Sequence, residues 1–397
     1  MKVSTTVTSR NKSTKFDLIL FYKLCPWVNL DLRTFFALPV PWGQDEWAGG
    51  LCEDKIFCTF ALFTMTESRT YHSIDVAKLV AAFFVVAIHA SFMSGVIHVV
   101  VIGLLARMAV PFFFTVSAFF FFRKNGGTAQ LRHYLKRMGL LYVFWFIVEL
   151  PMVIERSFVM HDSGFWDDLV ILLRNLVLNS TFRGSWFIMA LMLAIPVVYY
   201  VGKRLSTGWA LVLGLVFYVP LTLLSNYFYY LPVEFQRLFL SMFRNLGFIH
   251  NSFLVAIVFC AMGKLIAEHG AQLDKIPGWV IDWGLLLCVA GAAVEVLSHR
   301  ALFDDLYFML VPMTAVLLLW LLRHETRWHG NYLLMRNQST ITYFSHFVFI
   351  YLLRNVMDFR PGTFGFYLLV LTLCYFLTVI MRWLSGKRQF SWVRLGY

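Results

Sequence analysis

The sequence predicts an all-α protein, a bundle of helices that crosses a membrane about ten times. Of its 397 residues, 59% are hydrophobic and only 14% are charged, which lies outside the usual range of soluble domains. Apolar segments of roughly 16 to 22 residues follow one another from residue 75 onward, each close to the length that a helix needs to cross the hydrocarbon core. Lys and Arg residues gather in the short segments between them.

The expected membrane spans follow directly from these apolar segments. They are residues 75–93, 108–123, 138–155, 186–201, 208–224, 251–267, 278–297, 304–322, 341–357 and 363–383. Two further stretches, 94–107 and 165–182, are amphipathic or mixed in character, and we interpret them as interfacial or re-entrant pieces.

Charge predicts the orientation and the kind of partner. If the first span starts inside, the cytoplasmic side holds roughly twice as many Lys and Arg residues as the other side, so both termini are expected in the cytoplasm. The net charge of +12 is explained by this bias, and no nucleic-acid partner is expected. The six cysteines show no Cys-x-x-Cys spacing, so neither a metal site nor a disulfide framework is predicted.

Composition divides the chain into three parts. Residues 1–70 are polar and turn-rich, lack a signal peptide, and are interpreted as a poorly ordered extension. Met65 is an alternative start, because the residues after it form a natural lead-in to the first span. Residues 71–385 form the membrane domain, and residues 386–397 form a short basic cytoplasmic tail.

The first span, "DVAKLVAAFFVVAIHASF" (75–92), carries ionisable residues on one side. Lys78 and His89 are eleven residues apart, which places them on nearly the same helix face, about 16 Å apart along the axis. Asp75 lies within roughly 40° of that face. The simplest interpretation is that Asp75 and Lys78 mark the membrane interface. We favour function for His89, because imidazole can take and return a proton near neutral pH, as a general base must.

Several segments together resemble one known family. They are "DVAKLVAAFFVVAIHASF", "ARMAVPFFFTVSAFFFF" (106–122), "GSWFIMALMLAIP" (184–196), "RNLGFIHNSFLVAIVFCAMGKLI" (244–266) and "QSTITYFSHFVFIYLL" (338–353). In this order they resemble the acyltransferase-3 family of integral membrane acyltransferases, over about residues 71–385. That family includes bacterial O-acetyltransferases that modify O-antigen, enterobacterial common antigen and exopolysaccharide.

The resemblance implies an acyl donor, usually acetyl-CoA, on the cytoplasmic side and a hydroxyl-bearing glycan or lipid-linked saccharide as acceptor at the opposite face. No bound cofactor is implied. His89 corresponds to the catalytic histidine, while Lys78 and Arg107 would hold anionic parts of the donor or stabilise the developing oxyanion. Arg137 and Arg244 are further candidates for substrate or donor binding. For Arg137 the alternative is a topology charge that needs no other explanation.

Supporting roles are assigned to Asp75, Ser117, Trp186, Asn245 and Glu149. Trp186 either lines the acceptor path or anchors a helix at the interface. Glu149 is a partner for Arg107 or a protonated carboxyl group.

The chain also departs from the family pattern. Lys78 stands where the family often has arginine, and Ser117-Ala118 replaces the usual Ser-Gly. His346 sits one residue from the expected position, and we interpret His250 and His299 as packing or interface residues.

The predicted function is that of a multi-pass inner-membrane enzyme, an O-acetyltransferase acting on a surface or lipid-linked glycan. One alternative is a transporter or exporter of a small solute. Another is the membrane half of a serine or alanine racemase; because the sequence ends soon after the last span, no pyridoxal-phosphate domain is expected. Contact with membrane lipid is expected, and the sequence leaves the oligomeric state open.

Overall fold

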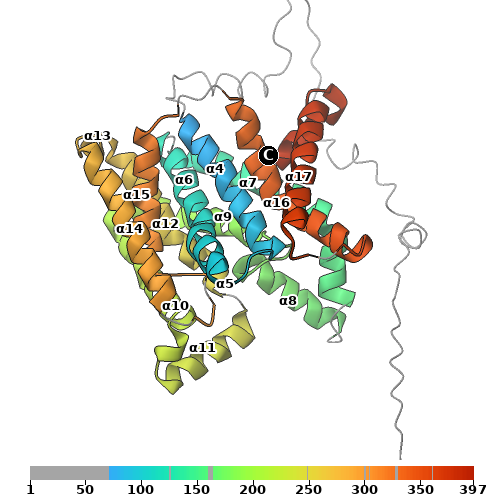
Figure 1. Cartoon of the computed structure of the whole chain (residues 1–397), viewed down its shortest axis with the longest axis horizontal. Coiled ribbons are helices and arrows are strands. Elements are labelled where there is room, and N and C mark those ends of the chain that lie inside the picture. Colours follow the sequence, from blue (N-terminus) through green and yellow to red (C-terminus); the bar gives the residue numbers. More distant parts are fainter. Residues whose placement is uncertain are drawn as a thin grey trace, which may run out of the picture. The chain divides into compact units, whose positions relative to one another are not determined.

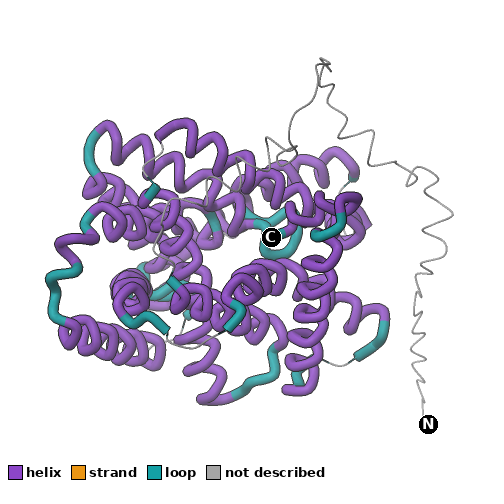
Figure 2. The backbone as a smooth tube through the Cα atoms, turned by 90° about the horizontal axis from the view of Figure 1, so that it is seen from above, coloured by secondary structure: helices purple, strands orange, loops and turns teal. Residues whose placement is uncertain are grey.

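A computed structural model describes residues 71–397 except 125–126, 160–163, 248, 299–300, 304, 327–329 and 360. The predicted extension over residues 1–70 and the alternative start at Met65 lie outside the described residues. The described part belongs to one compact unit, Arg69–Tyr397, and its regular elements are all helices (Figure 2). The all-α class is therefore confirmed for this part of the chain.

Twelve longer helices, including one that contains α5 and α6, form the described fold. They are α4 (His72–Ala90), the continuous segment Gly95–Arg123 that ends in α6 (Ala109–Arg123), α7 (Gly127–Ile154), α8 (Phe165–Leu178), α9 (Trp186–Arg204), α10 (Thr207–Ser225), α11 (Val233–Leu246), α12 (Phe253–Glu268), α14 (Gly278–Ser298), α15 (Leu310–Arg323), α16 (Tyr332–Tyr351) and α17 (Phe364–Ser385). The short elements are α5 (Gly95–Ile97), η2 (His98–Leu105), η3 (Ala106–Met108), η4 (Glu155–Val159), η5 (Phe228–Tyr230), η6 (Ile249–Asn251), α13 (Gly270–Leu273), η7 (Leu352–Val356) and η8 (Arg388–Gly396).

In the described part, seven helical segments are long and apolar enough to cross a membrane. The predicted spans 251–267 and 304–322 correspond to the shorter helices α12 and α15. The span 341–357 corresponds to α16, which is long but more polar than the seven. The count of ten spans and the location of the termini stay predictions.

One predicted boundary is wrong. Residues 94–107 were expected to form a separate interfacial or re-entrant piece, but from residue 95 they continue into α6 as one helical segment, Gly95–Arg123. The junction contains the wide turns of η2 and the tight turn of η3. Such local changes of helical pitch let the chain continue without a break. They also set the position of Arg107, which lies in η3.

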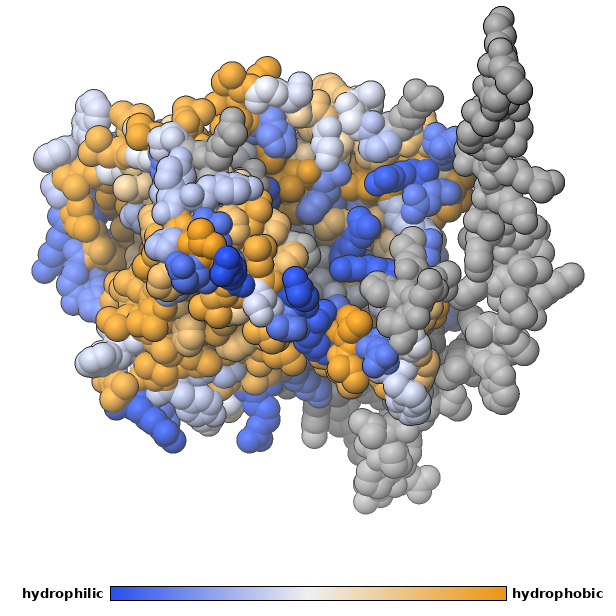
Figure 3. All heavy atoms as spheres, turned by 90° about the horizontal axis from the view of Figure 1, so that it is seen from below, coloured by the Kyte–Doolittle hydropathy of each residue, from blue (hydrophilic) through white to orange (hydrophobic). Residues whose placement is uncertain are grey.

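Helix α12 lies at the centre of one half of the bundle. It packs against α6, α9 and α10, while α4 packs against α16 and α6 (Figure 1). The side chains of α12 from Val255 to Ala261 are all buried, which explains why this 16-residue apolar segment is helical without a polar face. Large hydrophobic side chains are exposed along α10, α14 and α17, as expected for helices in contact with lipid, and hydrophobic residues also cover part of the bundle end shown in Figure 3.

Glycine allows α12 to approach its neighbours closely. A methyl group added at Gly263 would overlap the carbonyl oxygen of Thr115 in α6 and would lie 2.9 Å from the Cβ atom of Ala118. At Gly214 in α10 it would lie 2.5 Å from the Cα atom of Val258. Both contacts are with backbone atoms, so a larger residue could be accommodated only if the helices moved apart.

Replacing Gly263 with alanine is therefore expected to lower the free energy of unfolding by about 1–3 kcal/mol, because overpacking forces the α6 and α12 backbones apart. The midpoint of thermal unfolding in detergent measures the effect. Gly278→Ala at the start of α14 is the matched control, since an added methyl group meets no atom within 4 Å there. Equal midpoints for the two variants would contradict the close packing of α6 and α12.

Two amphipathic helices meet at one end of the bundle. The predicted interfacial stretch 165–182 contains α8, which leaves Phe165 and Trp166 exposed. Arg174 of α8 donates a hydrogen bond to the carbonyl oxygen of Asn245 (3.0 Å), and Asn179 donates to that of Leu246 (2.8 Å). These bonds satisfy carbonyl groups at the end of α11, which a helix terminus leaves without partners.

The segment predicted as a short basic tail folds back onto the bundle. The indole nitrogen of Trp145 in α7 donates to the carbonyl oxygen of Gly396 (3.0 Å). The hydroxyl of Tyr397 donates to the Oγ atom of Ser385 (2.6 Å), and Arg394 donates to the carbonyl oxygen of the same serine. The last residues therefore belong to the packed structure.

Candidate active site

Helices α4 and α16 lie side by side and carry polar residues at two levels. Near its start, α4 carries Asp75, which contacts Arg336 near the start of α16. Near its end, α4 carries His89, whose ring lies against that of His346 of α16. Both helices therefore run in the same direction, with charges at one level and histidines at the other. We call these two levels the cation end and the histidine end.

At the cation end, Asp75 forms a two-pronged ion pair with Arg336. The Nε atom of Arg336 lies 3.0 Å from Oδ1 of Asp75, and its Nη2 atom lies 2.7 Å from Oδ2. The carboxylate is buried, whereas the arginine side chain is 52% exposed. Asp75 is therefore more than an interface marker, because it holds a solvent-accessible guanidinium in one fixed geometry.

Two more cations act on the same place. The ammonium of Lys78 lies over the ring of Phe120 of α6, 5.0 Å from its centroid. Besides Asp75, the charges that act on Lys78 are Arg336 and Arg137 of α7. Three cations, Lys78, Arg336 and Arg137, thus lie within electrostatic range of one another, against Asp75 and, at the first turn of α4, Glu325. Such an excess of positive charge at a partly buried site favours binding of an anion.

At the histidine end, His89 is exposed, whereas Val86, Ala87 and Ala90 of α4 are buried. Its ring lies 5.4 Å from that of His346 and 4.5 Å from that of Phe347, centroid to centroid. His346 itself is fully buried. The Nδ1 atom of His346 lies 3.0 Å from the carbonyl oxygen of Thr342, and because a carbonyl only accepts, Nδ1 must carry the proton.

This hydrogen bond fixes the tautomer of His346. The Nε2 atom of the neutral ring then carries the lone pair, and it has no hydrogen-bond partner among the described residues. A buried nitrogen without a partner costs free energy, because nothing replaces the hydrogen bond it makes in water. A functional role would explain why the protein keeps such a group. We therefore add His346 to the candidate catalytic residues.

A third group of charges lies close to His89. Arg107 of η3 forms an ion pair with Asp305, which precedes α15, and the Nε2 atom of His250 lies 3.3 Å from the other oxygen of Asp305. The positive charge of Arg107 and the nearby His250 both favour the ionised form of the Asp305 carboxyl group. Arg107, Arg183 and Asp305 all act electrostatically on His89.

Three sequence-based interpretations change as a result. Arg107 pairs with Asp305, whereas the charge that acts on Glu149 is Arg183, so the suggested pairing of Arg107 with Glu149 is wrong. Arg107 lies at the histidine end and Lys78 at the cation end, so the two residues predicted to hold the donor or stabilise the oxyanion lie at different levels. His250, interpreted as a packing residue, belongs to this charged group. The pairing of Arg107 and His250 with Asp305 brings together three separate segments of the chain. Spacing along a single helix therefore could not predict it.

The remaining predicted residues lie outside these two groups. Glu149 of α7 is buried, and Ser117 is half-buried within α6 and makes no side-chain hydrogen bond to the described residues. Trp186 packs edge-on against Phe114, with ring centroids 5.7 Å apart. Arg244 is exposed at the end of α11, next to Asn245.

Comparison with known proteins decides the family. Residues 71–385, most of the chain, match the sequence model of a family described as "Acyltransferase domain". The chain belongs to the acyltransferase-3 family. The predicted resemblance is confirmed, and the helical bundle is that of a membrane acyltransferase domain.

Two curated relatives, both from Enterococcus faecalis, are named "Amino-acid racemase". One is 23% identical over 257 residues, which cover 62% of this chain and 35% of the relative. The other is 24% identical over 162 residues, which cover 36% of this chain and 22% of the relative. The matches thus span about a third or less of the relatives' length. No solved structure matches the chain.

The described residues include no group of three or more His, Cys, Asp or Glu side chains that could hold a metal ion. What the two ends offer instead is anion binding at one level and proton transfer at the other.

Proposed function

We propose that this acyltransferase moves an acyl group, most simply acetyl, from an acyl-CoA to a hydroxyl of a surface or lipid-linked glycan at the inner membrane. The observation that carries this proposal is the arrangement of α4 and α16. One pair of neighbouring helices holds an excess of cations at one level, around Lys78 and Arg336, and two contacting imidazoles, His89 and His346, at the other.

The cation end fits the donor. Coenzyme A carries phosphates, and Arg336, held by Asp75, presents a fixed and exposed fork of donors suited to phosphate oxygens. Arg137 is also exposed, and Lys78 adds a third positive charge deeper in the bundle. Because Lys78 and His89 are separated by about 16 Å along α4, the donor would extend its thioester along this helix toward the histidines.

The histidine end fits the transfer step. His89 is exposed and accepts the proton of the acceptor hydroxyl as its oxygen attacks the thioester carbonyl carbon. A C–O bond forms, the C–S bond breaks, and the thiolate of coenzyme A leaves and takes up a proton. The positive charge of Arg107 favours the negative oxygen that develops on the carbonyl. His346 supplies a second basic nitrogen beside His89.

The test is release of free thiol from acetyl-CoA by protein reconstituted in liposomes that contain an acceptor glycan. Wild type is expected to release thiol, and His89→Ala is expected to lose about 10²–10⁴-fold in rate, the range of general base catalysis. His269→Ala is the matched control, because His269 is an exposed histidine directly after α12 and belongs to neither end. Equal thiol release by wild type and His89→Ala would end the catalytic assignment of His89.

A second candidate comes from the relatives' name. Because two proteins named amino-acid racemase align with this membrane domain, the domain could instead handle a free amino acid, for example by transport. The two candidates differ in a direct way. Proteoliposomes of a transporter would accumulate labelled serine or alanine and release no thiol from acetyl-CoA, whereas an acyltransferase would do the reverse.

A further inference from the structure

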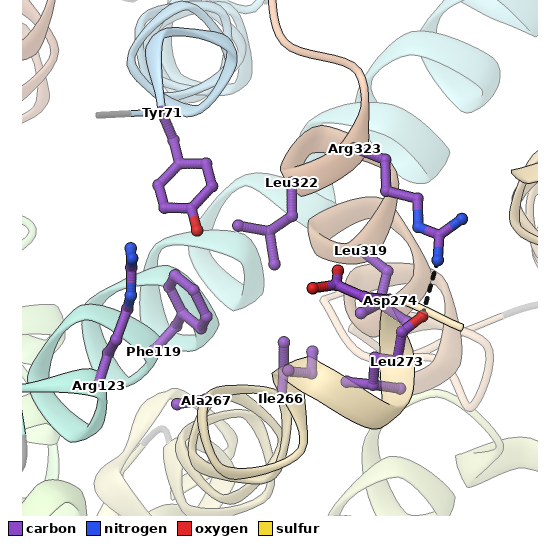
Figure 4. Close-up of a pocket in the computed structure, with 11 residues that line it drawn as sticks. Tyr71, Phe119, Arg123, Ile266, Ala267, Leu273, Asp274, Leu319, Leu322 and Arg323 are labelled. Carbon is purple, nitrogen blue, oxygen red and sulfur yellow. Dashed lines mark hydrogen bonds between the residues drawn. The ribbon is translucent and has the colours of Figure 1, made fainter. Parts of the chain in front are cut away.

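A separate cavity lies between helix ends on the side of the bundle where α4 begins. It encloses about 100 Å³ between Tyr71 before α4, the end of α6, the end of α12, α13 and the end of α15 (Figure 4). Neither the cation end nor the histidine end contributes a residue to its lining. The proposed acyl transfer therefore does not explain it.

Two arginines approach this cavity from opposite sides. The guanidinium of Arg123 lies over the ring of Tyr71 at 5.0 Å and near that of Phe119 at 6.0 Å. Arg323 donates one hydrogen bond to the carbonyl oxygen of Leu273 (2.8 Å), the dashed line in Figure 4. Neither guanidinium forms an ion pair with a carboxylate of the described residues, including Asp274, which also lines the cavity. The net charge of the lining is thus positive.

The rest of the lining is apolar. Ile266 of α12 and Leu319 and Leu322 of α15 lie between the two arginines, and Phe119 lies beside them (Figure 4). The arginines stand at the last residues of α6 and α15, the level at which helices leave the hydrocarbon core for the headgroup region. A cationic rim over an apolar wall at this level matches a phosphate that carries hydrocarbon chains.

We infer that this cavity binds the phosphate of an anionic phospholipid, with the part of the lipid next to the phosphate against the apolar wall and the acyl chains outside the cavity. In the predicted orientation this lipid belongs to the cytoplasmic leaflet. A net positive lining favours an anionic lipid over a zwitterionic one, because the two guanidiniums would repel the positively charged amine of a zwitterionic headgroup. This inference does not depend on the proposed acyl transfer, because no residue is shared.

The experiment is a titration of the purified full chain in detergent with phosphatidylglycerol, with the bound lipids counted by native mass spectrometry. Arg123→Gln is expected to weaken the tightest binding event roughly tenfold, the effect of losing one hydrogen bond to a charged group. Asp274→Asn is expected to strengthen it, because it removes the negative charge from the lining. Arg204→Gln, an exposed arginine at the end of α9, should leave it unchanged.

Further arms separate the possible sources of phosphate. Inorganic phosphate and coenzyme A are titrated in the same way, and phosphatidylcholine replaces phosphatidylglycerol in a parallel series. Preference for phosphatidylglycerol that Arg123→Gln reduces and Asp274→Asn increases supports the inference. Equal binding of both lipids, equal binding by all variants, or competition by coenzyme A for this event overturns it. Elution volume and melting midpoint show that each variant is folded.

Discussion

His346→Gln is expected to reduce the rate of acyl transfer by about 10²–10⁴-fold while leaving the KM for acyl-CoA close to that of wild type. The reason is local chemistry. His346 is buried, its Nδ1–H donates to the carbonyl oxygen of Thr342, its Nε2 atom has no partner among the described residues, and its ring stacks against that of His89. Glutamine keeps a polar side chain of similar size but provides no basic nitrogen. Steady-state thiol release at varied acetyl-CoA concentration measures both constants.

Ser345→Ala is the matched control for damage to the core. Ser345 is buried next to His346 in α16, and its hydroxyl bonds only weakly to the sulfur of Cys374, at 3.4 Å. If His346 acts through its nitrogen, the alanine variant retains activity, and the pH dependence of the rate changes only in the glutamine variant. An equal loss of rate in both variants, with lowered melting midpoints, would show that His346 has a structural role alone.

Much of the fold follows from the sequence because length and apolar composition are properties of single segments. Among the residues that the structure describes, seven helical segments meet both criteria, and the remaining predicted spans still correspond to helices. The predicted boundary near Arg107 failed because the residues before Arg107 are apolar enough to continue the helix, with η2 and η3 adjusting the helical pitch. Whether such a stretch breaks the helix or continues it depends on what it packs against.

The site was predictable only where one helix carries it. Spacing within α4 places Lys78 and His89 on one face, and this prediction needs no knowledge of neighbours. Arg336 and His346 are ten residues apart on α16, which leaves them about 80° apart around the helix, so spacing alone does not place them on one face. The pairing of Asp75 with Arg336 joins residues 261 positions apart. That pairing depends on which helices are neighbours, and a single sequence does not show it.

Lys78→Met is expected to raise the KM for acyl-CoA by about 10–100-fold with little change in kcat, because it removes one charged contact from the cation end. Lys78→Arg is expected to retain activity, since it keeps the charge that the family more often supplies with arginine. The lysine ammonium lies over Phe120 and beside Arg336 and Arg137, so either cation can lie among the same neighbours. Initial rates at varied acetyl-CoA give both constants.

Lys203→Met, at the end of α9, is the matched control, because it removes an exposed cation outside the cation end. A KM for acyl-CoA that rises equally in both methionine variants would indicate a general effect of net charge on an anionic substrate. A KM unchanged in Lys78→Met would place the donor elsewhere. A lower kcat with unchanged KM in His346→Gln, together with a higher KM and unchanged kcat in Lys78→Met, would assign proton transfer to one level of α4 and α16 and anion binding to the other.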